Sequence, residues 1–380
     1  MGCTQYQNCG GCVFRDLPIE LYQKQKAETV RQMLEEKLGD LTHIWQPPVF
    51  LKDGLRRRAA FAFCFQNQKL IFGFNAGKSN QIVDIETCLM IKPEINRLIA
   101  DFRALLASLC TVQTPKLKGK KSLKTQITQG DFLVLKADNG IDVVLETDVE
   151  LCLDHRLMIC DFMAQKDEII RFSWRKKHCA WAEPIVQKAK PFVKIGKTNV
   201  LISSGDFLQA SKEGEQALMA LVLSCVGQTR GKIADLFCGV GTFSYGLAEL
   251  ENTHITAVDV SSSLLGGLKK TINAEMIQNI SLQEKNLFLY PLTADELSNF
   301  DVVVFDPPRA GALETVRELS KIEPQKRPEK IVAVSCFPLT FARDAKVLID
   351  AGYILKSVTL LDQFVYSNHS ELVALFTNEK

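Results

Sequence analysis

From about residue 206 to the C-terminus, short apolar runs rich in β-branched residues alternate with segments of helical periodicity. This alternation predicts a parallel, doubly wound α/β sheet, because parallel strands are joined by crossover helices. No helix is expected between the last two runs, which predicts an antiparallel hairpin at one edge. The seven strands are expected at 233–238, 254–259, 280–284, 301–305, 330–335, 352–360 and 371–377.

Three of these runs end in residues that can bind or react. Asp306 follows one run, Cys336 follows another, and a glycine turn follows the run at 233–238. Ligands of open α/β sheets bind beyond the carboxyl ends of the strands, so these groups are expected to face one crevice. A carboxylate, a thiol and a cofactor loop on one edge favour an enzyme with a cysteine nucleophile.

The glycine turn indicates a nucleotide-like cofactor. Gly239 and Gly241 permit a tight turn and close approach of the backbone to a ligand at a helix N-terminus. Ser244 stands where a dinucleotide motif has its third glycine, which favours a methionine-bearing nucleoside instead. Asp259, which ends the next strand, can accept hydrogen bonds from ribose hydroxyls. The alternative is a purely structural turn. Seven strands that end in a hairpin are typical of a class I (Rossmann-like) S-adenosylmethionine-dependent methyltransferase, which favours cofactor binding.

Cys336 is the best candidate for the nucleophile. Pro338 opens a helix just after it, and the helix dipole is expected to lower the pKa of the thiol. Beside a methyl donor, a thiolate can add to C6 of a pyrimidine and make C5 nucleophilic. Glu371 is the candidate base for the C5 proton, and the alternative is a surface carboxylate at a strand edge. Asp306 is expected to orient either the cofactor or the base edge of the uracil.

The N-terminal half is expected to form a mixed α+β domain. A helix is predicted over 19–38 with Gly39 as its stop, and a hairpin turns near Asn67. Basic residues outnumber acidic ones in the first 190 residues, which favours binding of a polyanion such as RNA through its phosphates. The alternative is that these residues form an ordinary solvated surface. The basic clusters are Arg56-Arg57-Arg58, then Lys116, Lys118, Lys120, Lys121 and Lys124, and then Arg175-Lys176-Lys177. Alternating aromatic residues, which are expected to be core rather than base-stacking, are Phe61, Phe63 and Phe65.

A cluster of cysteines opens the chain. Cys3, Cys9 and Cys12 share one short loop, and Cys88 supplies a fourth thiol. Four thiolates can hold zinc or an iron–sulfur cluster, and their spacing does not choose between them. The spacing differs from the C-x3-C-x2-C of radical chemistry, which favours a structural role. The cysteines expected only to pack are Cys64, Cys110, Cys152, Cys160, Cys179, Cys225 and Cys238.

These features together resemble the RNA uracil-C5 methyltransferase family, which includes bacterial ribosomal and transfer-RNA 5-methyluridine enzymes. The resemblance covers essentially the whole chain. Besides the four cysteines, it rests on FLQA at 207–210, LFCGVGTF at 236–243, DPPRAG at 306–311, SCFPLTFARD at 335–344 and HSE at 369–371. It implies a [4Fe–4S] cluster on Cys3, Cys9, Cys12 and Cys88, cofactor contacts from Gln209, Phe237, Asp259 and Asp306, Cys336 as nucleophile and Glu371 as base.

Two departures from the family pattern bear on the substrate and the cofactor. Many ribosomal members carry a small β-barrel, the TRAM domain, before the cysteines, and here Cys3 is the third residue. This is similar to a compact branch that acts on a loop uridine of 23S rRNA, which makes 23S rRNA the expected substrate. Asp306 and Asp259 stand at positions where relatives can carry Asn and Glu.

The expected organisation has four parts. Residues 1–18 form the iron–sulfur loop, 19–45 a helix on the catalytic domain, 46–205 a central RNA-binding domain and 206–380 the methyltransferase domain. No run of about 18 apolar residues and no signal peptide are seen, so a cytoplasmic, monomeric enzyme without a membrane partner is expected. The alternatives are the same chemistry on a tRNA uridine or a cytosine, and a non-catalytic iron–sulfur RNA-binding or assembly factor.

Overall fold

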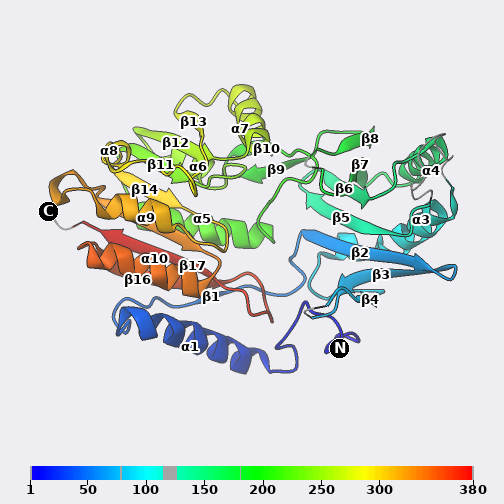
Figure 1. The fold of residues 1–380 in the computed structure, drawn as a ribbon, viewed down its shortest axis with the longest axis horizontal. Helices are drawn as coiled ribbons and strands as arrows, with labels where there is room; N and C mark the ends of the chain where they lie inside the picture. Colours follow the sequence, from blue (N-terminus) through cyan, green and yellow to red (C-terminus); the bar gives the residue numbers. More distant parts are fainter. Residues whose placement is uncertain (1, 78, 114–125, 180, 379–380) are drawn as a thin grey trace. The chain divides into compact units, whose positions relative to one another are not determined.

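The computed structural model describes residues 2–77, 79–113, 126–179 and 181–378. The chain divides into two compact units (Figure 1). Unit 1 comprises Met1–Arg15, Asp53–Val193 and Leu201–Ser211, and unit 2 comprises Asp16–Lys52, Lys194–Val200 and Lys212–Lys380. These borders differ from the predicted ones, since 46–52 and 194–200 belong to unit 2 and 206–211 to unit 1.

Unit 2 contains a mainly parallel sheet with the order β1-β16-β17-β15-β14-β11-β12-β13. The antiparallel pairs are β15 with β17 and β16 with β17, and the other neighbours are parallel. The strands are β1 (Val49–Phe50), β11 (Gly231–Leu236), β12 (Thr253–Asp259), β13 (Ile280–Glu284), β14 (Val302–Phe305), β15 (Lys330–Ser335), β16 (Ile354–Asp362) and β17 (Glu371–Thr377).

The seven predicted strands are all present, but the predicted edge hairpin is only half right. β16 and β17 do pair antiparallel, yet β17 lies inside the sheet between β15 and β16. The edge is formed by β1, a two-residue strand that was not predicted. β17 can lie centrally because its residues are nearly all buried and apolar.

Helices cover the sheet of unit 2. They are α1 (Ile19–Leu38), α5 (Lys212–Val226), α6 (Ser244–Ala248), α7 (Ser262–Ala274), α8 (Ala294–Leu297), α9 (Leu313–Ser320) and α10 (Pro338–Asp350), with a 3₁₀ turn at Pro324–Lys326. Figure 1 shows α1 lying along α10, which in turn packs on β15 and β16. The predicted helix over 19–38 is therefore confirmed, and it ends at Gly39, whose φ of +83° suits glycine.

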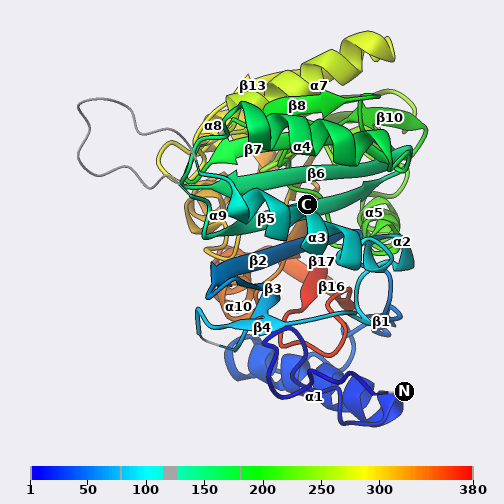
Figure 2. The same cartoon turned by 90° about the vertical axis from the view of Figure 1, so that its right-hand side faces the viewer.

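Unit 1 contains a seven-stranded sheet with the order β4-β3-β2-β5-β6-β7-β8, in which only β6 and β7 pair parallel. Figure 2 shows α3 and α4 on one face of this sheet. The elements are β2 (Arg58–Gln66), β3 (Lys69–Asn75), β4 (Ile82–Asp84), α2 (Pro93–Asn96), α3 (Ile99–Thr111), β5 (Gln129–Ala137), β6 (Gly140–Thr147), α4 (Leu153–Ala164), β7 (Ile169–Lys176) and β8 (Glu183–Gln187). A two-stranded sheet is formed by β9 (Phe192–Ile195) and β10 (Thr198–Leu201). Along the sequence, these strands lie where the chain passes from unit 1 to unit 2 and back.

The core of unit 1 is aromatic. Phe61 and Phe63 are fully buried with Phe72 and Phe132, which confirms that they are core rather than base-stacking residues. The hairpin of β2 and β3 turns at Asn67, as predicted. The lysine cluster at 116–124 lies outside the described residues.

Two cysteines were wrongly predicted to be packing residues. Cys160 and Cys179 are exposed, whereas Cys110 and Cys238 are buried as expected. Cys152 caps α4, since its thiol lies 3.1 Å from His155 Nδ1 and its N–H donates to the same nitrogen. No helix in the described ranges is both long and apolar enough to span a membrane.

Candidate functional site

The glycine turn after β11 has the backbone that its sequence predicts. Phe237, Gly239 and Gly241 have φ values of +60°, +57° and +88°. A Cβ on Gly241 would stand 2.8 Å from Tyr245 Cε2, so close packing requires glycine there. A Cβ on Gly239 would meet no atom within 4 Å, so that face of the turn is open. The ring of Phe237 packs 5.4 Å from that of Phe288.

Asp259, at the end of β12, orients this turn. Its Oδ2 accepts a 2.9 Å hydrogen bond from the Gly239 N–H, and its Oδ1 accepts a 2.8 Å bond from the Ser261 N–H. Both bonds come from the backbone and leave further lone pairs on each oxygen. The carboxylate can therefore hold the loop and still accept hydroxyl donors.

Asp235 is a second carboxyl beside the turn, and no role was predicted for it from the sequence. It is fully buried in β11, and its Oδ2 accepts a 2.5 Å hydrogen bond from the Ser244 hydroxyl at the start of α6. Burial, followed by the charges of Asp306 and Asp259, raises its pKa to about 7. The signal that could have identified it is an acidic residue inside an otherwise apolar strand.

Strand register brings the predicted nucleophile and base together. Ser335 pairs with Leu372 in the antiparallel ladder of β15 and β17, so the next residue, Cys336, lies at the level of Glu371. Asp306 follows β14, the other neighbour of β15, and its N–H donates to the Leu236 carbonyl of β11 at 3.2 Å. One edge of the sheet thus holds the glycine turn, Asp306, Cys336 and Glu371.

The electrostatics of the thiol contradict the prediction from the helix dipole. α10 does begin at Pro338, but burial, and then the charges of Glu371 and Asp306, raise the pKa of Cys336 to about 11. Arg309 acts in the opposite direction and is not sufficient to reverse the shift. Burial, aided by two carboxyl groups, thus keeps the pKa of this thiol high although it lies beside a helix N-terminus.

Glu371 is buried and not a surface carboxylate, since only 4% of its surface is exposed. Gln363 Nε2 donates to its Oε1 at 3.3 Å. Burial is the main cause that raises its pKa, and Asp306 adds to the effect, while Gln363 and the Lys26 ammonium lower it. Burial likewise raises the pKa of Asp306. A buried carboxyl with a raised pKa can carry a proton at neutral pH, as a general base must after it has acted.

Arg309 and Phe337 form the rim next to Cys336. The guanidinium of Arg309 lies over the Phe337 ring, 4.8 Å from its centroid. The segment 306–312 is held by Asp344, whose Oδ2 accepts the Ala312 N–H at 2.7 Å, and by Arg343, which donates to the Ala310 carbonyl at 2.8 Å. Two residues of α10 therefore hold the segment that carries Arg309 in place beside Cys336.

Gln209 lies in unit 1, so the structure does not group it with the other predicted cofactor residues, all of which lie in unit 2. Its carbonyl accepts a 3.1 Å bond from Arg57 Nε. The neighbouring Phe207 is 64% exposed and stacks under the guanidinium of Arg58, 4.6 Å from the ring centroid. The segment FLQA is thus held by two arginines at the start of β2.

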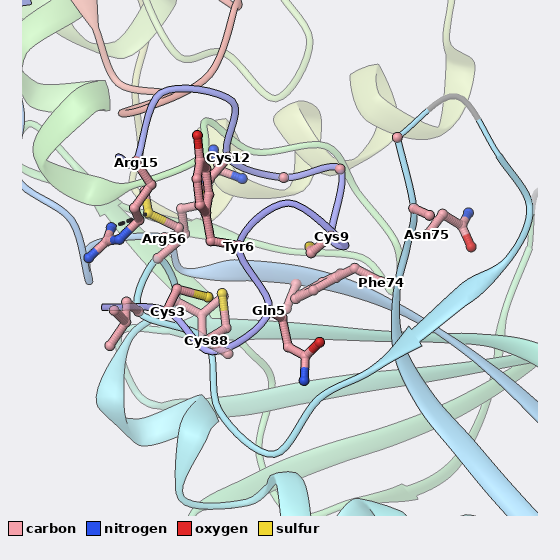
Figure 3. Close-up of a pocket in the computed structure, with 18 of the residues that line it drawn as sticks. Cys3, Gln5, Tyr6, Cys9, Cys12, Arg15, Arg56, Phe74, Asn75 and Cys88 are labelled. Carbon is pink, nitrogen blue, oxygen red and sulfur yellow. Dashed lines mark hydrogen bonds between the residues drawn. The ribbon is translucent and has the colours of Figure 1, made fainter. Parts of the chain in front are cut away.

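The four predicted ligand cysteines line a single pocket of unit 1, with a volume of about 410 Å³ (Figure 3). Cys3 and Cys88 lie next to each other in Figure 3. Burial, and then the neighbouring thiols, raise the pKa of Cys12 to about 11, and burial also raises that of Cys88. Arg15, Arg56 and Arg58 line the same pocket.

The donors of this pocket fit a thiolate-bound group in kind, but they do not form a metal-binding cluster as they are placed. Within the described part of the chain, no group of three or more His, Cys, Asp or Glu side chains could hold a metal ion. The surrounding arginines would offset the negative charge of four thiolates. The pocket is therefore a candidate site, and its four cysteines would have to move closer together to bind a metal ion or a cluster.

Comparison with known proteins connects these features to one family. A sequence profile described as tRNA (uracil-5-)-methyltransferase matches residues 20–379. An uncharacterized RNA methyltransferase of Brucella melitensis is 35% identical over 99% of this chain and 83% of its own length. The 23S rRNA (uracil(1939)-C(5))-methyltransferase RlmD of Erwinia tasmaniensis is 28% identical over 99% of this chain and 82% of its own length.

A solved structure agrees with this fold. It is the Pyrococcus abyssi tRNA (uracil-54, C5)-methyltransferase in complex with S-adenosyl-L-homocysteine, which superposes with a TM-score of 0.72 and 20% identity. The match covers 97% of this chain and 86% of that one. At this identity the likeness speaks for the fold, and it supports a class I methyltransferase sheet.

Proposed function

The chain belongs to the tRNA (uracil-5-)-methyltransferase family, and we propose that it methylates C5 of a uridine in 23S rRNA through a covalent bond between Cys336 and C6. As a member, it is an S-adenosylmethionine-dependent RNA uracil-C5 methyltransferase. The observation that carries the mechanism is the register of β15 and β17, which supports a thiol and a buried carboxyl acting on one ring.

The glycine turn fits S-adenosylmethionine. The open face at Gly239, the ring of Phe237 and the free lone pairs of Asp259 are the groups expected to hold the adenosyl part. Gly241 and Asp306 are proposed to complete this set. When bound, S-adenosylmethionine supplies the electrophilic methyl group that C5 of the uracil takes.

Cys336 is proposed to start the reaction. Its sulfur forms a bond to C6 as a thiolate, and the electron pair of the C5=C6 double bond moves toward C5 and O4. The thiol must first lose its proton, and Asp306 is proposed to accept it, so that Glu371 stays a carboxylate for the last step. Arg309 favours the thiolate by its charge.

Glu371 is proposed to finish the reaction. Once C5 carries the methyl group, the Glu371 carboxylate takes the C5 proton, the C–H electron pair re-forms the C5=C6 double bond, and the C6–S bond breaks to release the Cys336 thiolate. Burial keeps water away from this carboxyl and supports its role as a base.

We also propose that the pocket of Cys3, Cys9, Cys12 and Cys88 holds a [4Fe–4S] cluster with a structural role. The support is the convergence of four thiols from two distant segments on one pocket that also contains arginines. Zinc remains the alternative on the same thiols. Iron and acid-labile sulfide in anaerobically purified protein would favour the cluster, and one equivalent of zinc would favour the alternative.

The choice of 23S rRNA rests on the relative whose name gives that substrate, whereas the structural neighbour is named for tRNA. The uridine can be mapped in a deletion strain by measuring 5-methyluridine along its 23S rRNA and its tRNAs. Loss of one methylated uridine in 23S rRNA is expected. Loss in tRNA alone, or of a methylated cytosine, would overturn the substrate, and no loss from any RNA would favour a non-catalytic RNA-binding factor.

A further inference from the structure

The buried face of α1 contains a lysine. Tyr22, Lys26, Val30 and Leu34 recur every four residues and point into unit 2. Only 7% of Lys26 is exposed, although lysine is rarely buried unless its charge is compensated. A lysine in an apolar stripe therefore needs partners that repay the loss of hydration.

Lys26 finds these partners near the end of β16 and in the loop after it. Its Nζ donates to Asp362 Oδ1 at 2.6 Å, to the His369 carbonyl at 2.6 Å and to the Ser367 carbonyl at 3.0 Å. An ammonium has three N–H donors, so these acceptors, with the Tyr22 hydroxyl as a fourth, leave none of them unsatisfied. The same nitrogen lies 3.2 Å from the hydroxyl of Tyr22.

Tyr22 binds the other side of the same carboxylate. Its hydroxyl donates to Asp362 Oδ2 at 2.5 Å and accepts the Tyr366 N–H at 2.8 Å. Asp362 is completely buried, so both of its oxygens are satisfied by α1. Two side chains of α1 thus hold the last residue of β16 and three points of the loop over residues 363–370.

This loop leads directly into Glu371. The Lys26 contact at His369 is two residues before Glu371, and Gln363, the residue after Asp362, donates to its Oε1. The charged and titratable groups that bear on Glu371 are Asp306 after β14, Cys336 after β15 and Lys26 on α1. Lys26 is the one cation among these three, and its charge favours the carboxylate form of Glu371.

We propose that Lys26 is a positioning residue for the reaction, fixing the loop that carries Glu371 and supplying the positive charge that keeps this carboxyl able to accept the C5 proton. The proposal rests on the proposed function, because it needs Glu371 to be the base. It assigns to α1, which lies more than 330 residues from Glu371 in the sequence, a part in the last chemical step.

The test is Lys26→Met, compared with Lys24→Met as the matched control. Lys24 is on the same helix, is 70% exposed and pairs only loosely with Glu28, so its removal changes the charge of α1 without touching the loop. With radiolabelled methyl donor and rRNA transcript, Lys26→Met is expected to resolve the covalent adduct about tenfold more slowly at pH 7, because less of Glu371 is then in its carboxylate form. The KM for RNA is expected to change less than twofold, and the rising limb of the pH–rate profile to move to higher pH.

Lys26→Arg keeps the charge and is expected to recover the position of this limb. A Lys26→Met enzyme indistinguishable from Lys24→Met would overturn the inference. So would a slow enzyme whose pH limb is unchanged and which Lys26→Arg does not rescue, because that is a purely structural effect.

Two further variants keep the outcomes separable. If Lys26→Met does not fold, Tyr22→Phe removes one bond each from Asp362, Lys26 and Tyr366 and retains the charge. It should slow adduct resolution without moving the pH limb, and wild-type resolution would reject the positioning role. Glu371→Gln is measured alongside. Full turnover in that variant would overturn both the base assignment and this inference. A trapped adduct in Glu371→Gln, together with a wild-type rate of adduct resolution in Lys26→Met, would overturn this inference alone.

Discussion

Adding one methyl group to either glycine of the turn after β11 should separate folding from cofactor binding. Gly241→Ala places a Cβ 2.8 Å from Tyr245 Cε2 and 3.0 Å from Leu268 Cδ2, at a φ of +88°. The left-handed backbone costs an alanine about 1–2 kcal/mol, and overpacking adds about 1–3 kcal/mol. Unfolding free energy should therefore fall by roughly 2–5 kcal/mol.

Gly239→Ala should behave differently. Its φ of +57° carries the same backbone cost of about 1–2 kcal/mol, but no atom lies within 4 Å of the new Cβ. That Cβ projects into the open face proposed for the cofactor. We expect S-adenosylhomocysteine to bind at least about tenfold more weakly, a loss of about 1.4 kcal/mol.

Calorimetry can measure both quantities, with thermal unfolding for stability and titration with S-adenosylhomocysteine for affinity. Gly266→Ala is the control, because this glycine is inside α7 with no atom within 4 Å and an alanine there should stabilise by up to about 1 kcal/mol. The reasoning is refuted if Gly241→Ala unfolds no more easily than Gly239→Ala, or if Gly239→Ala binds the ligand as tightly as the wild type.

Four other outcomes follow from the two sites. Cys336→Ala should abolish methyl transfer to below about one thousandth of wild type in a radiolabel assay, while RNA affinity by filter binding stays within about twofold, because only the nucleophile is lost. The rate of adduct resolution should rise with pH through about 8, since Glu371 acts as a carboxylate and its pKa is raised to that value; a flat profile between pH 6 and pH 9 contradicts this. The folded-state pKa of Glu371 lies above its usual value of 4.5, so the folded protein loses stability as the pH rises from 4.5 to about 8. In Glu371→Gln, the Tm should fall less over this pH range. Cys12→Ser should remove iron and sulfide from anaerobically purified protein if the proposed cluster is present, and an unchanged iron content would reject it.

Much of unit 2 could be predicted from sequence because its strands are continuous apolar runs and its helices have ordinary start and stop residues. The order of the strands could not, since pairing in a sheet is non-local and β17 looks the same whether it is central or at an edge. β1 was missed because two residues give no periodic signal.

The site shows the same division. Cys336, Asp306 and the glycines follow strands that are evident in the sequence, so their common edge was predictable. The direction of the Cys336 pKa was not, because a helix N-terminus is visible in the sequence, whereas the two carboxyl groups act only through the fold. Lys26 was missed for a similar reason, since its partner Asp362 is 336 residues away.

The most direct test of the mechanism is mass spectrometry of Glu371→Gln after incubation with S-adenosylmethionine and the RNA substrate, followed by nuclease and protease digestion. A glutamine cannot take the C5 proton, so the account predicts a peptide in which the Cys336 sulfur carries a 5-methylated pyrimidine nucleotide. The same peptide should be absent when Cys336 is also changed to alanine. An unmodified Cys336 peptide alongside methylated RNA would contradict the account.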